Sequence, residues 1–80
     1  MTKQDCIDRA IACYRAGTSH PNAHHSVTLM ELARAFTALS RSAARRAKHA
    51  AFAQVWYDFL FSGSPLPEGA MAFLMADGLF

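Results

Sequence analysis

Apolar residues recur along most of this chain at intervals of three or four, which is the spacing of one face of an α-helix. The pattern predicts an all-α fold with four helices, over about residues 3–16, 28–39, 43–61 and 67–77. We expect residues 1–80 to form a single helical domain. A domain of this size buries only about 60% of the surface that its unfolded chain exposes, so its core is marginal.

The first helix has a clear start signal. Thr2 followed by Asp5 is typical of a capping box, in which the two residues satisfy each other's backbone N–H groups. Gly17 is the expected stop, because glycine commonly ends a helix. Five apolar residues at helical spacing predict the core face of this helix: Cys6, Ile7, Ala10, Cys13 and Tyr14.

The second helix is expected to begin at Thr28, which with Glu31 resembles a second capping box. An unbroken helix from there to Phe61 would be about 50 Å long at ~1.5 Å per residue, whereas a compact domain of this length is about 30 Å across. We therefore predict a break over residues 40–42, where Ser40 and Ser42 can cap a new helix. The alternative is one long bent helix whose overhang is covered by a second copy of the chain.

The third helix has two contrasting sides. One side is predicted to be buried and consists of Ala44, Ala47, Ala51, Val55 and Phe59. The other changes from cationic to aromatic along its length and consists of Arg45, His49, Ala53, Trp56 and Leu60. The fourth helix has almost no polar face, so we expect it to pack against the aromatic end of the third.

Composition adds a surplus of apolar side chains to this picture. Apolar residues make up 52% of the chain, and the sequence has six Phe, two Tyr and one Trp. Such a surplus favours a protein partner or a homodimer, because a small monomer lacks the interior to cover it. The charge is also uneven, since the segment between Glu31 and Asp58 contains basic residues but no acidic one.

Two small groups of residues were considered for redox or metal chemistry. Cys6 and Cys13 would lie about 10.5 Å apart on one helix, beyond the ~7 Å that a disulfide spans. They are predicted to be core residues, and free thiols favour a cytoplasmic location. His20, His24 and His25 are weak metal candidates in a predicted loop over 18–26, and we expect no metal or cofactor. The sequence shows no signal peptide and no membrane span.

Catalysis is the least supported class of function, because the chain has no nucleophile elbow, no phosphate-binding glycine loop and no adjacent pair of carboxylates. The run from Glu31 to Arg46, ELARAFTALSRSAARR, is similar to a helix-turn-helix. That resemblance implies a DNA-binding regulator in which Arg41, Arg45 and Arg46 contact DNA. It is the alternative to our main hypothesis.

The main hypothesis is a non-catalytic protein–protein interaction module, such as an adaptor or an inhibitor of a larger complex, that also self-associates. An apolar centre beside arginines is typical of protein interfaces. The expected anchors are aromatic, aliphatic or methionine side chains: Trp56, Tyr57, Leu60, Phe61, Met71 and Met75. The expected basic patch consists of Arg41, Arg45, Arg46, Lys48 and His49. No small-molecule substrate is evident.

Overall fold

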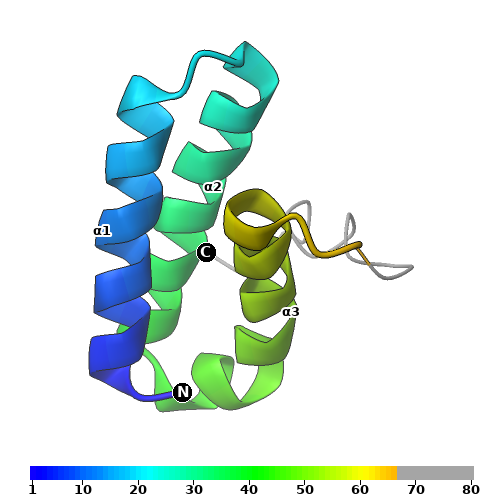
Figure 1. Cartoon of the computed structure of the whole chain (residues 1–80). Helices are drawn as coiled ribbons and strands as arrows, with labels where there is room; N and C mark the ends of the chain where they lie inside the picture. Colours follow the sequence, from blue (N-terminus) through cyan, green and yellow to red (C-terminus); the bar gives the residue numbers. More distant parts are fainter. Residues whose placement is uncertain (67–80) are drawn as a thin grey trace.

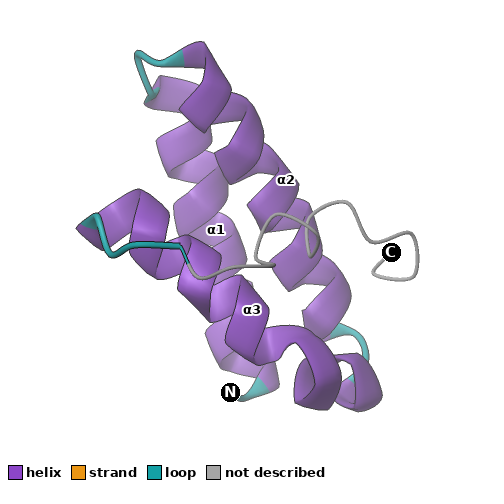
Figure 2. Ribbon diagram, turned by 90° about the vertical axis from the view of Figure 1, so that its right-hand side faces the viewer, coloured by secondary structure: helices purple, strands orange, loops and turns teal. Residues whose placement is uncertain are grey.

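The computed structural model describes residues 1–66 and has three α-helices: α1 (Lys3–Ser19), α2 (Ala23–Ser40) and α3 (Ala43–Ser62). α1 and α2 lie side by side as an antiparallel pair (Figure 1), and α3 crosses this pair obliquely (Figure 2). The all-α prediction is confirmed. The count of four helices is not supported, because the described residues contain three and the predicted helix over 67–77 lies outside them.

The start of α1 is confirmed as predicted. The Thr2 hydroxyl accepts from the Asp5 N–H at 3.1 Å, and the Thr2 N–H donates to the Asp5 carboxylate at 2.9 Å. This backbone hydrogen bond is the main reason that the pKa of Asp5 lies below its ordinary value. The first turn of α1 is therefore stabilised by contacts between residues only three apart.

The predicted end of α1 is wrong, because the helix continues past Gly17 to Ser19. Gly17 is buried against α2, and a Cβ atom at this position would lie 3.0 Å from Met30 Sδ and 3.3 Å from Leu29 Cβ. The absence of a side chain allows the two helices to approach closely here. This glycine therefore serves helix packing and not helix termination.

α2 begins at Ala23, five residues before the predicted start at Thr28. The Asn22 side chain caps it by accepting from the N–H groups of His24 and His25, at 3.0 and 3.1 Å. Thr28 lies inside the helix and its hydroxyl donates to the His24 carbonyl at 2.9 Å. The predicted capping box at Thr28 is therefore wrong. The prediction missed the first turn of α2 because that turn is mostly solvent-exposed and has no apolar period to indicate a helix.

The predicted break between the second and third helices is confirmed. α2 ends at Ser40, and Ser42 caps α3 by accepting from the Arg45 N–H at 3.2 Å. Arg46 secures the junction, because its Nη1 donates to the carbonyl oxygens of Leu39 and Ser40, both at 3.0 Å. These bonds satisfy carbonyl groups that the end of a helix leaves without an intrahelical partner.

The core lies where α3 crosses the α1–α2 pair. Its buried apolar residues are Cys6, Ala10, Cys13, Leu29, Leu32, Ala33, Ala35, Phe36, Leu39, Ala53 and Trp56. Both cysteines are free and fully buried, as predicted for core residues. The Phe36 and Tyr57 rings meet edge to face with centroids 6.1 Å apart, which joins α2 to α3. None of the described helices combines the length and apolarity needed to cross a membrane.

The buried side of α3 differs from the prediction. Ala44, Ala47 and Ala51 are exposed, whereas Ala53 and Trp56 are buried. Val55 and Phe59, also predicted on the buried side, are part-buried, and Phe59 packs against the core, so only the alanine part of that side faces solvent. Trp56 decides the orientation, because burying one indole removes far more apolar surface from water than burying several alanine methyl groups.

Candidate partner-binding groove

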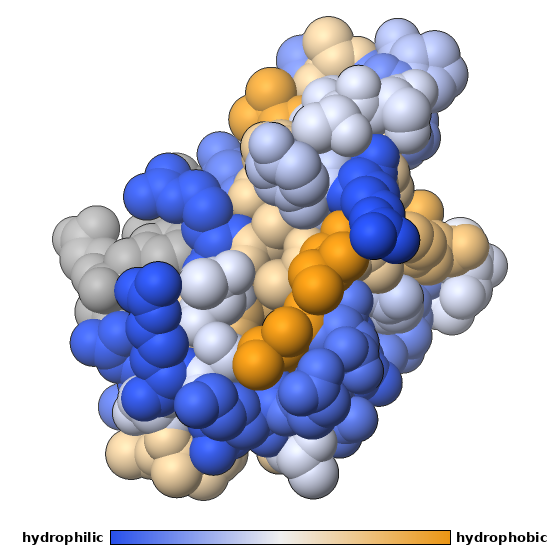
Figure 3. All heavy atoms as spheres, turned by 90° about the vertical axis from the view of Figure 1, so that its left-hand side faces the viewer, coloured by the Kyte–Doolittle hydropathy of each residue, from blue (hydrophilic) through white to orange (hydrophobic). Residues whose placement is uncertain are grey.

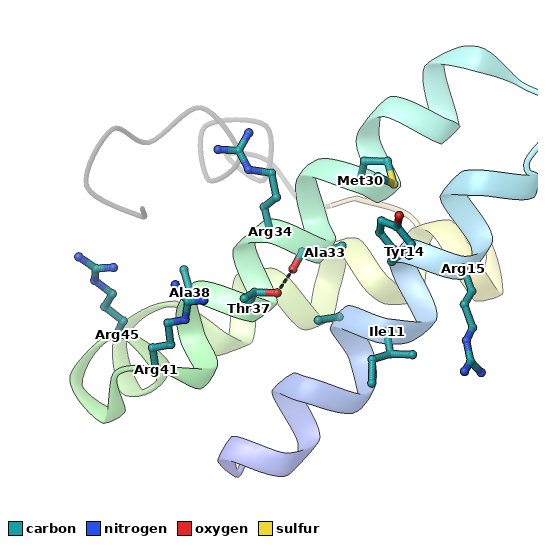
Figure 4. A pocket seen from close by; sticks show the side chains of 11 residues that line it. Ile11, Tyr14, Arg15, Met30, Ala33, Arg34, Thr37, Ala38, Arg41 and Arg45 are labelled. Atoms are coloured by element: carbon teal, nitrogen blue, oxygen red, sulfur yellow. Dashed lines mark hydrogen bonds between the residues drawn. The ribbon is translucent and has the colours of Figure 1, made fainter.

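A groove of about 720 Å³ runs between α1 and α2 (Figure 4). Most of α3 lies behind the two helices in this view, so the groove is on the face of the pair that α3 leaves open. Only Arg45, from the first turn of α3, reaches it. The lining residues are Ala10, Ile11, Tyr14, Arg15, Met30, Ala33, Arg34, Thr37, Ala38, Arg41 and Arg45.

Small side chains such as Ala33 and Ala38 form the floor of the groove, and the larger apolar side chains of Ile11 and Tyr14 form its wall. Thr37 adds no unsatisfied polar group, because its hydroxyl donates to the Ala33 carbonyl at 2.8 Å. Ile11 is 46% exposed and Tyr14 is 55% exposed. The predicted placement of Tyr14 on the core face is therefore wrong. Figure 3 shows this face of the molecule, where apolar atoms are exposed between hydrophilic ones.

The charge around the groove is of one sign. Four arginines line it, namely Arg15, Arg34, Arg41 and Arg45, and the lining contains no acidic residue. A concave apolar surface surrounded by guanidinium groups concentrates positive potential, because its low-dielectric walls screen charge less than water does. The groove therefore favours an apolar ligand that carries negative charge.

The structure divides the predicted basic patch among different surroundings. Arg41 and Arg45 line the groove. Arg46 is part-buried and hydrogen-bonded to the end of α2, so it stabilises the fold. Lys48 is exposed and His49 is part-buried, and neither lines the groove. Two of the five predicted residues are thus brought together with an apolar surface.

The predicted aromatic anchors lie mainly in or beside the core. Trp56 is only 4% exposed. Tyr57 and Leu60 are part-buried against the core, and Arg9 lies over the Tyr57 ring at 5.7 Å from its centroid. Phe61 is 42% exposed and stacks on Tyr57 with centroids 4.3 Å apart. The other two predicted anchors, Met71 and Met75, lie outside the described residues.

The candidate histidines lie around the turn between α1 and α2. The rings of His20 and His25 meet edge to face with centroids 5.3 Å apart, and His20 Nδ1 accepts from the Asn22 N–H at 3.1 Å. His24 is exposed on the first turn of α2. Within residues 1–66, no three His, Cys, Asp or Glu side chains are grouped so that they could hold a metal ion.

The sequence analysis did not identify Ile11, Tyr14 and Met30 as binding residues. One signal was present, because Ile11 falls outside the predicted core stripe of α1 and lies three residues before Tyr14. A helix with apolar residues on two sides has more apolar surface than one neighbour covers. Met30 gives no such signal, because it lies between Leu29 and Leu32 in an apolar part of the second helix.

Comparison of the chain with protein-family models, with curated proteins and with solved structures finds no match.

Proposed function

We propose that this protein is a non-catalytic interaction module whose α1–α2 groove binds an acidic amphipathic segment of a protein partner. The observation that carries the proposal is the combination of the exposed apolar side chains Ile11 and Tyr14 with four lining arginines and no lining acid. A partner of this chemistry would cover Ile11 and Tyr14 and place carboxylates beside the guanidinium groups.

A helix is the best occupant of such a groove. Two packed helices present a furrow whose small floor residues, such as Ala33 and Ala38, let a third helix approach closely. From Met30 to Arg41 the wall formed by α2 is about 16 Å long at ~1.5 Å per residue, which matches about three helical turns. Helix-in-groove recognition of this kind uses apolar anchors at positions i, i+3 or i+4, and i+7.

The test is a selection from a random library of helix-forming peptides against the immobilised chain, with the Ile11→Ser variant as competitor to remove peptides that bind elsewhere. We expect the recovered peptides to combine apolar residues at helical spacing with Asp or Glu, and to lack Lys and Arg. Two outcomes would show that the groove has no such role: recovery of basic peptides, or removal of every recovered peptide by the competitor.

Matched variants locate the binding. Ile11→Ser should weaken binding of a selected peptide about tenfold, because it removes an exposed apolar contact at the centre of the site. Val27→Ser is the control: Val27 is also an exposed β-branched residue of the α1–α2 pair, 58% exposed, but it does not line the groove. Equal losses in the two variants would place the peptide outside the groove.

The alternative proposal is DNA binding through the helix-turn-helix resemblance. It has less support, because Ala43, Ala44 and Ala47 occupy much of the exposed surface at the start of α3, whereas base readout needs long polar side chains. Light scattering over a concentration series, with and without random-sequence duplex DNA, separates the cases. A complex that weakens steeply with salt would favour DNA binding, and a stable dimer alone would support the predicted self-association.

A further inference from the structure

The groove is not uniform along its length. Gly17 closes one end, because the close approach of α1 and α2 there puts the Met30 side chain against the glycine backbone. Arg41 and Arg45 stand at the opposite end, where α2 ends and α3 begins. The site thus has a closed end, where Arg15 lies beside apolar side chains, and an open end where Arg41 and Arg45 stand.

The arrangement of the side chains agrees with this polarity. In Figure 4, Arg34, Arg41 and Arg45 gather on one side of the view and Tyr14 and Met30 lie on the other. Arg15, the remaining lining arginine, extends away from the other three. Arg34 on α2 and Arg41, the residue that caps the end of α2, are about two turns apart, or about 10 Å at ~1.5 Å per residue. The cationic end therefore extends over about two turns of a bound helix.

We infer that the bound segment carries its acidic residues clustered at one end, and that this end lies beside Arg41 and Arg45 while its apolar anchors lie toward Met30 and Gly17. This inference rests on the proposed function and specifies the partner of the same groove. Charge complementarity supports it, because Arg41 and Arg45 offer two neighbouring guanidinium groups at the open end, whereas carboxylates at the closed end would lie against apolar walls with Arg15 alone beside them. Carboxylates at the open end gain charge-assisted contacts and keep access to water.

The test uses two peptides of identical composition, each about 12 residues long so that it spans the groove as a helix. One carries its glutamates together in the first turn, and the other carries them spread along the polar side. We expect the clustered peptide to bind about tenfold more tightly. Equal affinities would overturn the inference and leave the proposed function intact, whereas failure of both peptides to bind would count against the proposed function itself.

Variants of the chain identify the end that recognises the charge. Arg41→Gln combined with Arg45→Gln should remove the preference for the clustered peptide. The control is Lys3→Gln combined with Lys48→Gln, which removes the same charge from two exposed positions outside the groove lining. Circular dichroism of each variant checks that the fold is kept. A preference that survives the arginine variant, or disappears in the lysine variant, would contradict the inference.

A paramagnetic label gives the direction of the bound peptide independently of affinity. With a nitroxide on the acidic end of the clustered peptide, the amide signals of Ala38 and Arg41 should broaden more than those of Gly17 and Met30. The same label on the apolar end should reverse the pattern. Broadening of Gly17 and Met30 by the acidic end would overturn the inferred orientation.

Discussion

The two faces of the α1–α2 pair are both apolar, yet residues 1–66 close only one of them. On the face toward α3, Cys6, Cys13, Leu32 and Phe36 are all 0% exposed. On the opposite face, Ile11 and Tyr14 stay about half exposed at the edge of the groove. The single crossing helix among the described residues covers one face of the pair, and the second face is the one that we propose binds a partner.

The arginines of the molecule also differ in their surroundings. Arg9 and Arg46 are part-buried, the first over the Tyr57 ring and the second hydrogen-bonded to the end of α2, whereas four other arginines line the groove. Long cationic side chains can border a surface that is alternately open and covered, because their aliphatic stems lie along apolar atoms while their heads stay hydrated. The arginines around the apolar groove are therefore compatible with the binding role that we propose for it.

The largest expected effect tests the difference in burial directly. Phe36→Ala should lower the free energy of unfolding by about 3–5 kcal/mol, because it leaves a cavity in the core. Tyr14→Ala, which truncates an aromatic ring on the open face, should change it by less than about 0.5 kcal/mol. Urea denaturation of the two variants measures both values. Similar losses would mean that the open face is as much a part of the core as the covered one.

The next effect concerns the closed end of the groove. Gly17→Val should cost about 1–3 kcal/mol, since its side chain must displace Leu29 and Met30 where the helices touch. Thr18→Val, the control, changes an exposed residue one position on and should be nearly neutral. Thermal unfolding of both variants compares them. A neutral Gly17→Val variant would show that the helices do not approach closely at this point.

A smaller effect is expected where α2 meets α3, at the cationic end of the groove. Ser42→Ala should lower stability by about 1 kcal/mol, because the Arg45 N–H loses the hydroxyl that caps α3. Ser42→Asn should retain most of the stability, since asparagine also caps helices well. Denaturation midpoints of the two variants test this. Equal destabilisation would indicate that Ser42 acts through packing and not through its hydrogen bond.

The smallest expected effect on stability comes from the covered face and appears only at high pH. Burial raises the pKa of the Cys13 thiol to about 12, from an ordinary value of 9.0. The folded state therefore holds this proton more tightly than the unfolded state. Its contribution to stability is fully present below about pH 9 and is lost as the pH rises toward 12.

Unfolding measured between pH 8 and pH 10 should show this decline, and Cys13→Ala should reduce it. Modification by a thiol reagent at pH 8 should also be slow in the native protein and rapid after denaturation, because the thiolate is the reactive form. Rapid modification of the native protein would mean that the covered face opens readily to solvent.

Several local features of the fold follow from the sequence alone. The Thr2–Asp5 capping box and the break at Ser42 depend on hydrogen bonds between residues three apart, so the nearby sequence determines them. The burial of Cys6 and Cys13 follows from their helical spacing, which places them on one side of α1. Of the groove, the sequence identified only Arg41 and Arg45, as members of a basic patch.

Tertiary structure decided which of several apolar faces became the core. Spacing alone assigned Ala44, Ala47 and Ala51 of α3 to the interior, but Trp56 buries more surface and these alanines face outward. Spacing also placed Tyr14 in the core, whereas the packing of α2 leaves Tyr14 exposed. It made Gly17 a helix stop, whereas α2 packs directly on Gly17. These outcomes depend on the volumes of side chains that are distant in sequence, and no periodic pattern within one helix contains that information.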